Sequence, residues 1–233
     1  MLDFVILTDD WYERPLKKDW YIKNIIKEDL LLMEALRNLG FSVDRVSWSS
    51  KDFEWSSVRF VVFRSTWDYF ERLSEFRNWL DFASKKTTFI NTYPQILWNL
   101  DKSYLSFFSQ KGINIVPSFF VKKKTSLVEI MNRFCWDEVV IKPVFSAAAW
   151  NTYRVSPKNL TKLEPVFLSL QKKQKMIVQE FQKSVLSFGE VSMVLIGGRV
   201  THSVIKKVKK GDYRVQDDYG GTVGLYKASE KEV

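Results

Sequence analysis

One lysine, Lys142, lies inside an apolar stretch of the sequence at residues 139–143. Burying an ammonium group in an apolar strand is costly unless an anion meets it. A loop of small residues that contains Ser146 follows directly, at residues 145–149. This order is what a site that closes on phosphate groups requires, so the stretch indicates the binding of a phosphate-bearing anion.

Further charged groups follow at the ends of predicted strands. A second apolar strand, residues 176–181, ends in Glu180 and Phe181. A hairpin then opens on Glu190 and leads to Lys206, and Arg214 lies in a polar loop beyond it. Carboxylates and cations placed at strand ends are suited to bind a polar ligand. His202, in the second strand of the hairpin, has no second histidine or nucleophilic cysteine nearby, and we interpret it as structural.

A separate polar turn comes earlier in the chain, after the predicted strand at residues 58–63. It packs a cation, an indole and a carboxylate together: Arg64, Trp67 and Asp68. Ligands bind at the carboxyl ends of strands in parallel sheets, where Asp9 and Asp10 also fall. We favour substrate binding for this turn, of a small zwitterion at most. The alternative is that these are ordinary polar loop residues.

The elements that must position these residues differ between the two halves of the chain. In the first half, strands at 4–7, 43–48, 58–63 and 88–90 alternate with helices at 22–36 and 76–82, which predicts a parallel α/β sheet. In the second half, antiparallel α+β structure is predicted, with Asp101 capping a helix at 102–111. Its other elements are an edge strand at 116–121, a helix at 126–134, strands at 139–143, 152–155 and 176–181, and a hairpin at 190–196 and 199–206 around Gly197-Gly198. Tyr93-Pro94-Gln95 suggests a hinge between the halves.

The composition limits the classes of protein that remain. The chain has 233 residues, 45% of them hydrophobic, and its apolar runs are much shorter than the roughly 20 residues of a membrane helix. The N-terminus does not resemble a signal peptide. One cysteine, Cys135, excludes an internal disulfide, and a single histidine excludes a multi-histidine metal site. We therefore expect a soluble cytoplasmic protein without membrane contact.

The net charge of +9 requires an anionic partner, either a polyphosphate nucleotide or a nucleic acid. The basic clusters Lys122-Lys123-Lys124 and Lys172-Lys173 lie in polar, loop-like stretches. Such runs are usually solvated faces, and the aromatic residues do not alternate with these lysines. The sequence therefore favours a nucleotide over a nucleic acid.

Six motifs in this order resemble the ATP-grasp superfamily, in the branch around prokaryotic glutathione synthetase and the ATP-grasp ligase of D-cycloserine biosynthesis. They are Asn99-Leu100-Asp101-Lys102, Ile141-Lys142-Pro143, Ser146-Ala147 with Thr152, Gln179-Glu180-Phe181, Gly189-Glu190-Val191-Ser192, and Gly211-Asp212-Tyr213-Arg214 with Gly220-Gly221-Thr222. The turn around Arg64 to Tyr69 is similar to the N-terminal domain of the same branch. The resemblance implies a pre-ATP-grasp α/β domain at 1–95, an ATP-grasp lobe at 96–182 and an incomplete second lobe at 183–233.

The resemblance also implies a role for each motif. Lys102 and Lys142 would meet the α- and β-phosphates of ATP, and Ser146 belongs to the loop over the phosphates. Glu180 and Phe181 would line the adenine pocket, Glu190 would bind the ribose, and Lys206 and Arg214 would neutralise the transferred phosphate as catalytic residues. Taken alone, Lys102 would be an exposed helix residue, and Glu190 is equally well explained as a surface strand residue.

The implied chemistry is ATP-dependent ligation through an acylphosphate, with Mg²⁺ as cofactor and a small, amino-acid-like carboxylate as substrate. Asp-x-Asn or Glu-x-Asn patterns, which supply Mg²⁺ ligands in this superfamily, do not follow Thr222. We therefore expect a truncated or degenerate ligase, with no metal ligands and weak or no turnover alone. The alternatives are a nucleotide-binding pseudoenzyme and a basic nucleic-acid-binding protein, and a homo-oligomer is compatible with the sequence.

Overall fold

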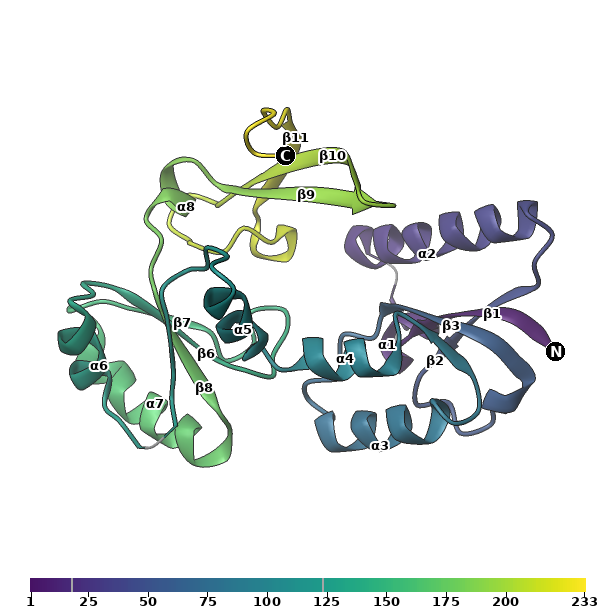
Figure 1. Cartoon of the computed structure of the whole chain (residues 1–233), viewed down its shortest axis with the longest axis horizontal. Helices are drawn as coiled ribbons and strands as arrows, with labels where there is room; N and C mark the ends of the chain where they lie inside the picture. Colours follow the sequence, from purple (N-terminus) through teal and green to yellow (C-terminus); the bar gives the residue numbers. More distant parts are fainter. Residues whose placement is uncertain (18, 123) are drawn as a thin grey trace. The chain divides into compact units, whose positions relative to one another are not determined.

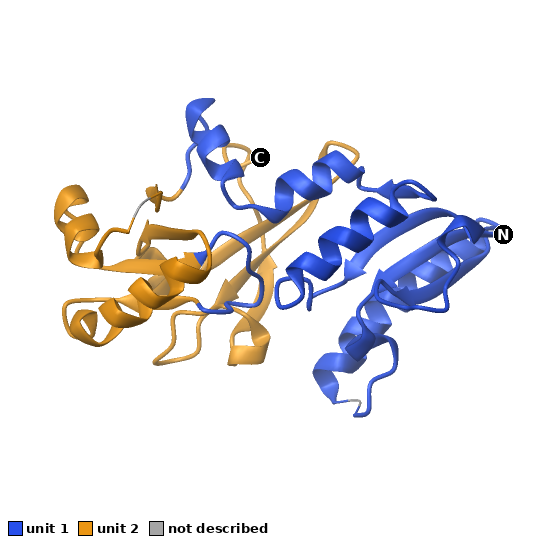
Figure 2. Ribbon diagram, turned by 90° about the horizontal axis from the view of Figure 1, so that it is seen from below, with its two compact units in different colours: residues 1–115, 143–151 blue, residues 116–142, 152–233 orange. Residues whose placement is uncertain are grey.

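The computed structural model of the chain describes residues 1–17, 19–122 and 124–233. These residues form two compact units, which Figure 2 shows in different colours. Unit 1 contains residues 1–115 and 143–151, and unit 2 contains residues 116–142 and 152–233. Each unit is described separately below, and the division into domains at 95 and 182 stays a prediction.

Unit 1 is built on a parallel four-stranded sheet, as the alternating pattern predicts. Its strands are β1 (Leu2–Thr8), β2 (Val43–Ser47), β3 (Val58–Ser65) and β4 (Thr88–Ile90), in the order β2-β1-β3-β4. Parallel strands end at the same edge of a sheet, so the segments after β1, β2 and β3 meet there.

Helices cover both faces of this sheet (Figure 1). On one face, α2 (Trp20–Asn38) packs Met33 against Ile6 of β1. On the other face, α3 (Leu73–Ala83) packs Phe76 and Leu80 into a core with the neighbouring residues of β1. This alternation follows from the two-residue period of a strand. The shorter helices are α1 (Asp10–Glu13), α4 (Tyr93–Leu100), α5 (Tyr104–Gln110) and a 3-10 turn at Trp55–Ser57.

Tyr93-Pro94-Gln95 form the first turn of α4, and the hinge suggested for them stays a prediction. Proline is well tolerated there, since the N–H groups of the first turn have no partner within the helix. Asp101 does act as a local cap, accepting a hydrogen bond from the Ser103 amide at 2.8 Å. The following helix, α5, is shorter than predicted, so Lys102 lies in the turn before it.

Unit 2 contains a four-stranded sheet in the order β5-β8-β6-β7. The strands are β5 (Ser118–Phe120), β6 (Val139–Pro143), β7 (Tyr153–Val155) and β8 (Met176–Glu180), and β5 is an edge strand as its preceding proline predicts. Two helices, α6 (Leu127–Phe134) and α7 (Leu160–Lys173), pack against one face of this sheet. Ser126 caps α6 through the Glu129 amide, as its sequence motif predicts.

The loop predicted around Lys172-Lys173 is wrong, because both lysines lie in the last turn of α7. Pro165, inside this helix, hides the helical pattern in the sequence, because proline normally interrupts a helix. Two cations at a helix C-terminus are favourable there because they face the negative end of the helix dipole. Lys123, part of the other basic cluster, lies outside the described residues.

A second sheet of unit 2 has the order β11-β10-β9 and is antiparallel. Its strands are β9 (Glu190–Ile196), β10 (Arg199–Lys207) and β11 (Thr222–Tyr226), with α8 (Ser184–Ser187) before β9 and a 3-10 turn at Asp217–Tyr219 before β11. The hairpin turn has positive φ angles at both Gly197 and Gly198, as predicted. In the outer strand, β11, Val223 is 58% exposed and Leu225 is 91% exposed.

Among the described residues, none of the helices combines the length and the apolar character needed to cross a bilayer.

Candidate nucleotide and substrate sites

Lys142 is half-buried in β6, where the sequence places it. Burial lowers the pKa of its ammonium group, and the negative charge of Glu190 offsets this effect only in part. Among the described residues, no carboxylate lies within 4 Å of this ammonium group. A half-buried cation without a close counter-ion favours an anionic ligand.

Glu190 and Lys206 face each other across β9 and β10, with 3.5 Å between Oε1 and Nζ. Gly189, just before Glu190, makes this arrangement possible. Its φ angle is +114°, and a Cβ atom there would lie 2.5 Å from the carbonyl oxygen of Lys206. The structure therefore brings three residues of the predicted nucleotide site into one electrostatic group, formed by Lys142, Glu190 and Lys206.

Glu180 and Phe181 end β8, and both of their backbone amides are already bonded. The Glu180 amide donates to the Pro117 carbonyl at 3.0 Å, and the Phe181 amide donates to the Glu138 carbonyl at 2.9 Å. A purine base that binds to the backbone at this point would therefore form hydrogen bonds with the carbonyl groups or with the amide of the next residue. The Phe181 ring is buried, with the Arg154 guanidinium 3.9 Å from its centre.

Arg214 is held within its own loop. Its Nη2 donates to Oδ2 of Asp212 at 2.6 Å, and its guanidinium lies 3.6 Å from the Tyr219 ring centre. The bond to Arg214 is the main cause that holds the pKa of the Asp212 carboxyl well below its usual value. The loop itself is fixed by Tyr213, which donates to the Thr152 carbonyl at 3.2 Å and packs edge-on against Phe181. The guanidinium has five N–H donors, so this pairing leaves donors for an anion.

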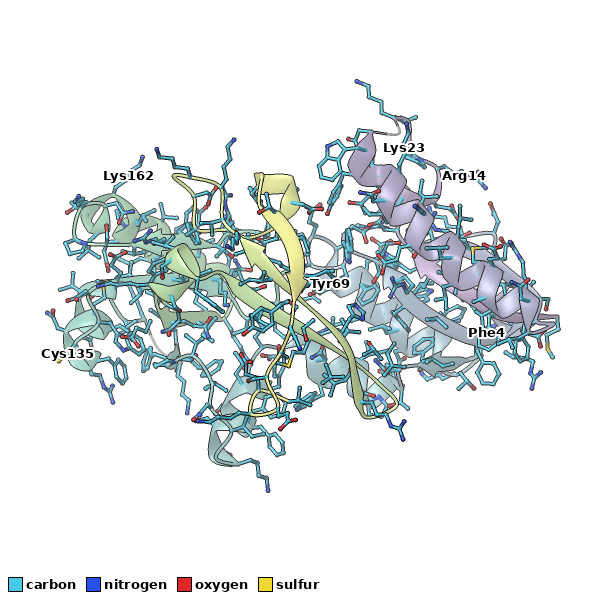
Figure 3. The ribbon with its side chains drawn as sticks, turned by 90° about the horizontal axis from the view of Figure 1, so that it is seen from above. Phe4, Arg14, Lys23, Tyr69, Cys135 and Lys162 are labelled. Carbon is cyan, nitrogen blue, oxygen red and sulfur yellow. The ribbon has the colours of Figure 1, made fainter. Side chains whose placement is uncertain are left out.

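In unit 1, Lys102 contacts the loop that follows β6. Its ammonium group donates to the carbonyl oxygen of Ser146, and lies 3.3 Å from the Ser146 hydroxyl. The Tyr69 hydroxyl, on a side chain labelled in Figure 3, donates to the same carbonyl at 3.4 Å. The predicted pair Lys102 and Ser146 is thus in direct contact.

The loop at 145–151 has the backbone of a glycine-rich loop although it contains no glycine. The φ angles of Ala148, Ala149 and Asn151 are +47°, +56° and +49°. This left-handed conformation is disfavoured for residues with a Cβ atom. Where a right-handed residue is followed by a left-handed one, as at the start of such a turn, successive amides point toward one side and form a concave binding place for anions.

The three residues of the predicted substrate turn lie at the carboxyl edge of the sheet but bond to different partners. Arg64 pairs with Glu28 and lies 3.6 Å from the buried Asp29. Asp68 accepts hydrogen bonds from Trp48 Nε1 at 2.7 Å and from Arg72 Nη1 at 3.0 Å. Trp67 is partly exposed and packs edge-on against Tyr12. The sequence did not reveal Glu28, Asp29 and Trp48 as partners, because they are distant along the chain, whereas Arg72 is only four residues from Asp68.

Asp9 is the carboxylate at this edge with the most altered titration. It is 3% exposed and caps α1 by accepting from the Tyr12 amide at 2.9 Å. Burial raises the pKa of its carboxyl to about 6, against the lowering effect of the Tyr12 hydrogen bond. Asp10, the neighbouring residue, is bound instead by the hydroxyls of Ser47 and Ser49.

A hollow of about 450 Å³ lies beside this edge, entirely within unit 1. Three amide side chains line it from α4 and the residues just before it: Asn91, Gln95 and Asn99. Thr66 and Tyr69 contribute hydroxyl-bearing side chains, and no charged residue lines the hollow. The signal for it in the sequence is the spacing of the amides, four residues apart, which places them on one side of a helix.

The described residues do not include a group of three or more histidine, cysteine, aspartate or glutamate side chains that could hold a metal ion. Mg²⁺ in nucleotide sites is usually held by one or two carboxylates together with the phosphates of the substrate. The finding therefore concerns only a metal site built entirely from side chains of the described residues.

Taken together, a parallel α/β unit followed by a unit with two antiparallel sheets, and the lysines placed on them, define the ATP-grasp fold. Residues 4–91 match the family model described as D-cycloserine synthetase DcsG, N-terminal domain. The chain is 28% identical over 184 residues to the cycloserine biosynthesis protein DcsG of Streptomyces lavendulae, a match that covers 75% of this chain and 60% of that protein. The chain therefore spans well under two thirds of the length of this curated relative.

Solved structures agree with this assignment of the fold. The crystal structure of D-cycloserine synthetase DcsG superposes with a TM-score of 0.81 at 24% identity, covering 97% of this chain and 75% of that chain. The ATP-grasp ligase PsnB, solved with a phosphomimetic variant of its minimal precursor, Mg and ADP, gives a TM-score of 0.58 at 15% identity, covering 99% and 79%. The resemblance to ATP-grasp ligases and the predicted fold class are thus confirmed. The link to glutathione synthetase stays a prediction.

Proposed function

We propose that the chain is the nucleotide-binding part of an ATP-dependent carboxylate–amine or carboxylate–thiol ligase that works through an acylphosphate. The observation that carries this proposal is Lys142, a half-buried cation without a close carboxylate partner on a strand of an ATP-grasp fold. A buried point charge of this kind gains most from a phosphate group. We place the reaction in the cytoplasm, where ATP is available.

Within this proposal, each group of residues has a defined task. Lys142 in unit 2 and Lys102 in unit 1 are assigned to the α- and β-phosphates, and the loop that contains Ser146 is assigned to phosphate binding. Phe181 lines the adenine pocket and Glu190 accepts hydrogen bonds from the ribose. Lys206 and Arg214 neutralise the negative charge that develops on the transferred phosphate.

The reaction has two steps in this scheme. A substrate carboxylate attacks the γ-phosphate of ATP to give an acylphosphate and ADP, and an amine or thiol then displaces phosphate. Catalysis comes from positioning and charge neutralisation, not from a covalent protein intermediate. When bound with ATP, Mg²⁺ would neutralise phosphate charge, as in other reactions of this type.

We propose a small amino-acid derivative as the carboxylate substrate, held at the carboxyl edge of the sheet in unit 1. The hollow lined by Asn91, Gln95 and Asn99 suits an uncharged part of such a molecule that both donates and accepts hydrogen bonds. The name of the relative D-cycloserine synthetase supports a substrate of amino-acid size. Trp67, Arg64 and Asp68 bind the zwitterionic part of the substrate. The substrate then competes with the partners that Arg64 and Asp68 have in the free protein.

The test is ATP binding to the whole chain, measured by calorimetry with and without Mg²⁺. Lys142→Met is expected to weaken binding by about 10- to 100-fold, because a hydrogen bond to a charged group contributes about 1.5–3 kcal/mol. The matched control is Lys162→Met, on the exposed surface of α7 (Figure 3), which is expected to leave the affinity unchanged. Equal affinities of the two variants would exclude Lys142 from the nucleotide site.

A second candidate function is a nucleotide-binding pseudoenzyme, which would bind ATP through Lys142, Glu180 and Glu190 without turning it over. It predicts the same ATP binding and the same loss in Lys142→Met. It differs in giving no ADP with any carboxylate substrate, whatever the Mg²⁺ concentration. Substrate-dependent ADP release by the wild-type chain would decide for the ligase.

A further inference from the structure

The two basic clusters of the sequence come together in unit 2. Lys122 and Lys124 precede α6, whereas Lys172 and Lys175 lie at and just after the end of α7, about fifty positions later in the sequence. All four line one hollow of about 380 Å³. The arrangement could not be seen in the sequence, where each cluster was interpreted as a solvated face.

A side-chain clamp holds the two segments against each other. The Gln171 side chain, on α7, accepts a hydrogen bond from the Thr125 amide at 3.1 Å and donates one to the Thr125 carbonyl at 2.8 Å. An amide that satisfies both backbone groups of one residue fixes that segment as a neighbouring strand would. The lysines on the two sides of the hollow are therefore held close together by the fold.

These ammonium groups lack internal counter-ions. None of Lys122, Lys124, Lys172 and Lys175 forms an ion pair or side-chain hydrogen bond with the residues that the structure describes, and no carboxylate lines the hollow. Unit 2 also carries the whole excess charge of the protein: 20 Lys and Arg against 11 Asp and Glu, compared with 16 and 16 in unit 1. A held group of like charges raises the local potential, and an anion relieves it.

The hollow is separate from the proposed nucleotide residues. Met176, at the amino end of β8, lies in its wall, whereas Glu180 ends the same strand. No residue of the hollow belongs to the set that we assign to ATP. Its charge therefore has no use in the ligase scheme.

The lining indicates the chemistry of the ligand. Between the lysines, the wall is aliphatic, formed by Val121, Leu168 and Met176, and no aromatic side chain lines it. Nucleic-acid bases are held mainly by aromatic stacking, which this hollow does not offer. Lysines are compact point charges that bind phosphate or carboxylate oxygens singly. We propose that this hollow is a second anion site, which binds a small molecule carrying two or more phosphate or carboxylate groups.

The experiment measures the binding of inorganic pyrophosphate to the whole chain by calorimetry. All proteins carry Lys142→Met, so that the nucleotide site contributes little. The double substitution Lys172→Gln and Lys175→Gln is compared with Lys158→Gln and Lys162→Gln, which removes the same charge from exposed positions of the same unit. The first pair is expected to weaken binding at least 10-fold, and the control pair less than twofold.

Repeating the measurement with citrate shows whether the hollow prefers phosphate or carboxylate groups. The proposal is supported if the binding of pyrophosphate or of citrate depends on Lys172 and Lys175. Equal affinities of the two double variants would overturn it. The proposal would also be overturned if binding of a 20-base-pair DNA duplex depended on Lys172 and Lys175 while binding of pyrophosphate and of citrate did not. Thermal unfolding of both double variants checks that neither pair of substitutions disturbs the fold. When Lys172→Gln and Lys175→Gln are made in a protein that retains Lys142, its affinity for ATP is expected to be unchanged.

Discussion

Burial acts on Lys142 and Asp9 in the same physical sense, because it favours the uncharged form of each. It lowers the pKa of the lysine and raises the pKa of the carboxyl to about 6. The consequences differ, because an anionic ligand would offset the cost of burying the lysine. Asp9 is enclosed by backbone amides, so burial of its ionised carboxylate lowers the stability of unit 1.

Asp9→Asn is expected to alter how the stability of the protein depends on pH. The folded-state pKa of Asp9, about 6, lies above the ordinary value of 3.8 for an aspartate carboxyl. The folded protein therefore loses stability as pH rises from about 4 to above 6, by up to about 3 kcal/mol from this group. Asparagine keeps the oxygen that caps α1 but cannot ionise. Urea unfolding between pH 4 and 8 should show a smaller loss for the variant.

The control for this prediction is Asp19→Asn, since Asp19 caps α2 through the Ile22 amide in an exposed position. Its difference from the wild type is expected to stay constant over the same pH range. A constant difference for Asp9→Asn as well would contradict the raised pKa.

Single residues could be predicted from the sequence where their chemistry conflicts with their surroundings. Lys142 is visible because a lysine in an apolar strand needs an explanation. The bonds of Arg64 and Asp68 are not visible, because their partners, such as Glu28 and Trp48, lie on other elements. Burial of Asp9 likewise depends on the packing of segments distant in sequence.

At the scale of an element, the loop at 145–151 stores strain at its alanines. A left-handed conformation costs a non-glycine residue about 1–2 kcal/mol, whereas glycine adopts it freely but loses more chain entropy on folding. Ala148→Gly and Ala149→Gly are therefore each expected to stabilise the protein by about 0.5–1 kcal/mol, equivalent to about 1–4 °C in Tm. Differential scanning calorimetry measures this shift.

Ala147→Gly serves as the control, because the φ angle of Ala147 is not positive. Here glycine only adds entropy to the unfolded chain, so Tm is expected to fall. A fall in Tm for all three substitutions would show that the loop is not strained at Ala148 and Ala149.

Elements with a regular pattern and a capping signal were predictable, such as α6 with its Ser126 cap and the hairpin at Gly197-Gly198. Two helices were not, and proline is involved in both. Pro94 lies in the first turn of α4, a position that suits proline but where the sequence suggested a hinge, and Pro165 lies within α7. At Pro165 tertiary packing outweighs the local preference of proline, since Phe167 is buried in a core.

At the scale of the whole molecule, charge divides the chain as clearly as packing does. Unit 1 is neutral and unit 2 carries the excess of nine positive charges. The division of charge follows from the boundary near residue 115, because residues 143–151, which pack with unit 1 although they lie between strands of unit 2, carry no charged side chain. A discontinuous unit of this kind depends on contacts between distant segments, which no local pattern reports.

The charge of unit 2 allows a test between nucleotide and nucleic-acid binding. Non-specific DNA binding depends on counter-ion release and is expected to be lost between 50 and 200 mM salt. ATP binding at the half-buried Lys142 is screened less and should persist at 200 mM salt. Fluorescence anisotropy with a labelled duplex and with a labelled ATP analogue compares the two. Tight DNA binding at 200 mM salt that is indifferent to Lys142→Met would favour the nucleic-acid alternative.

The outer strand β11 bears on how the protein behaves at high concentration. An edge strand offers a row of backbone donors and acceptors to any other strand, and β11 adds to them the exposed side chains of Val223 and Leu225. Protein folds usually protect such an edge with a charge, a proline or a bulge. We therefore expect β11, together with β9, the other edge strand of this sheet, to promote precipitation at high concentration. A lysine in place of Val223 is expected to keep concentrated solutions clear for longer.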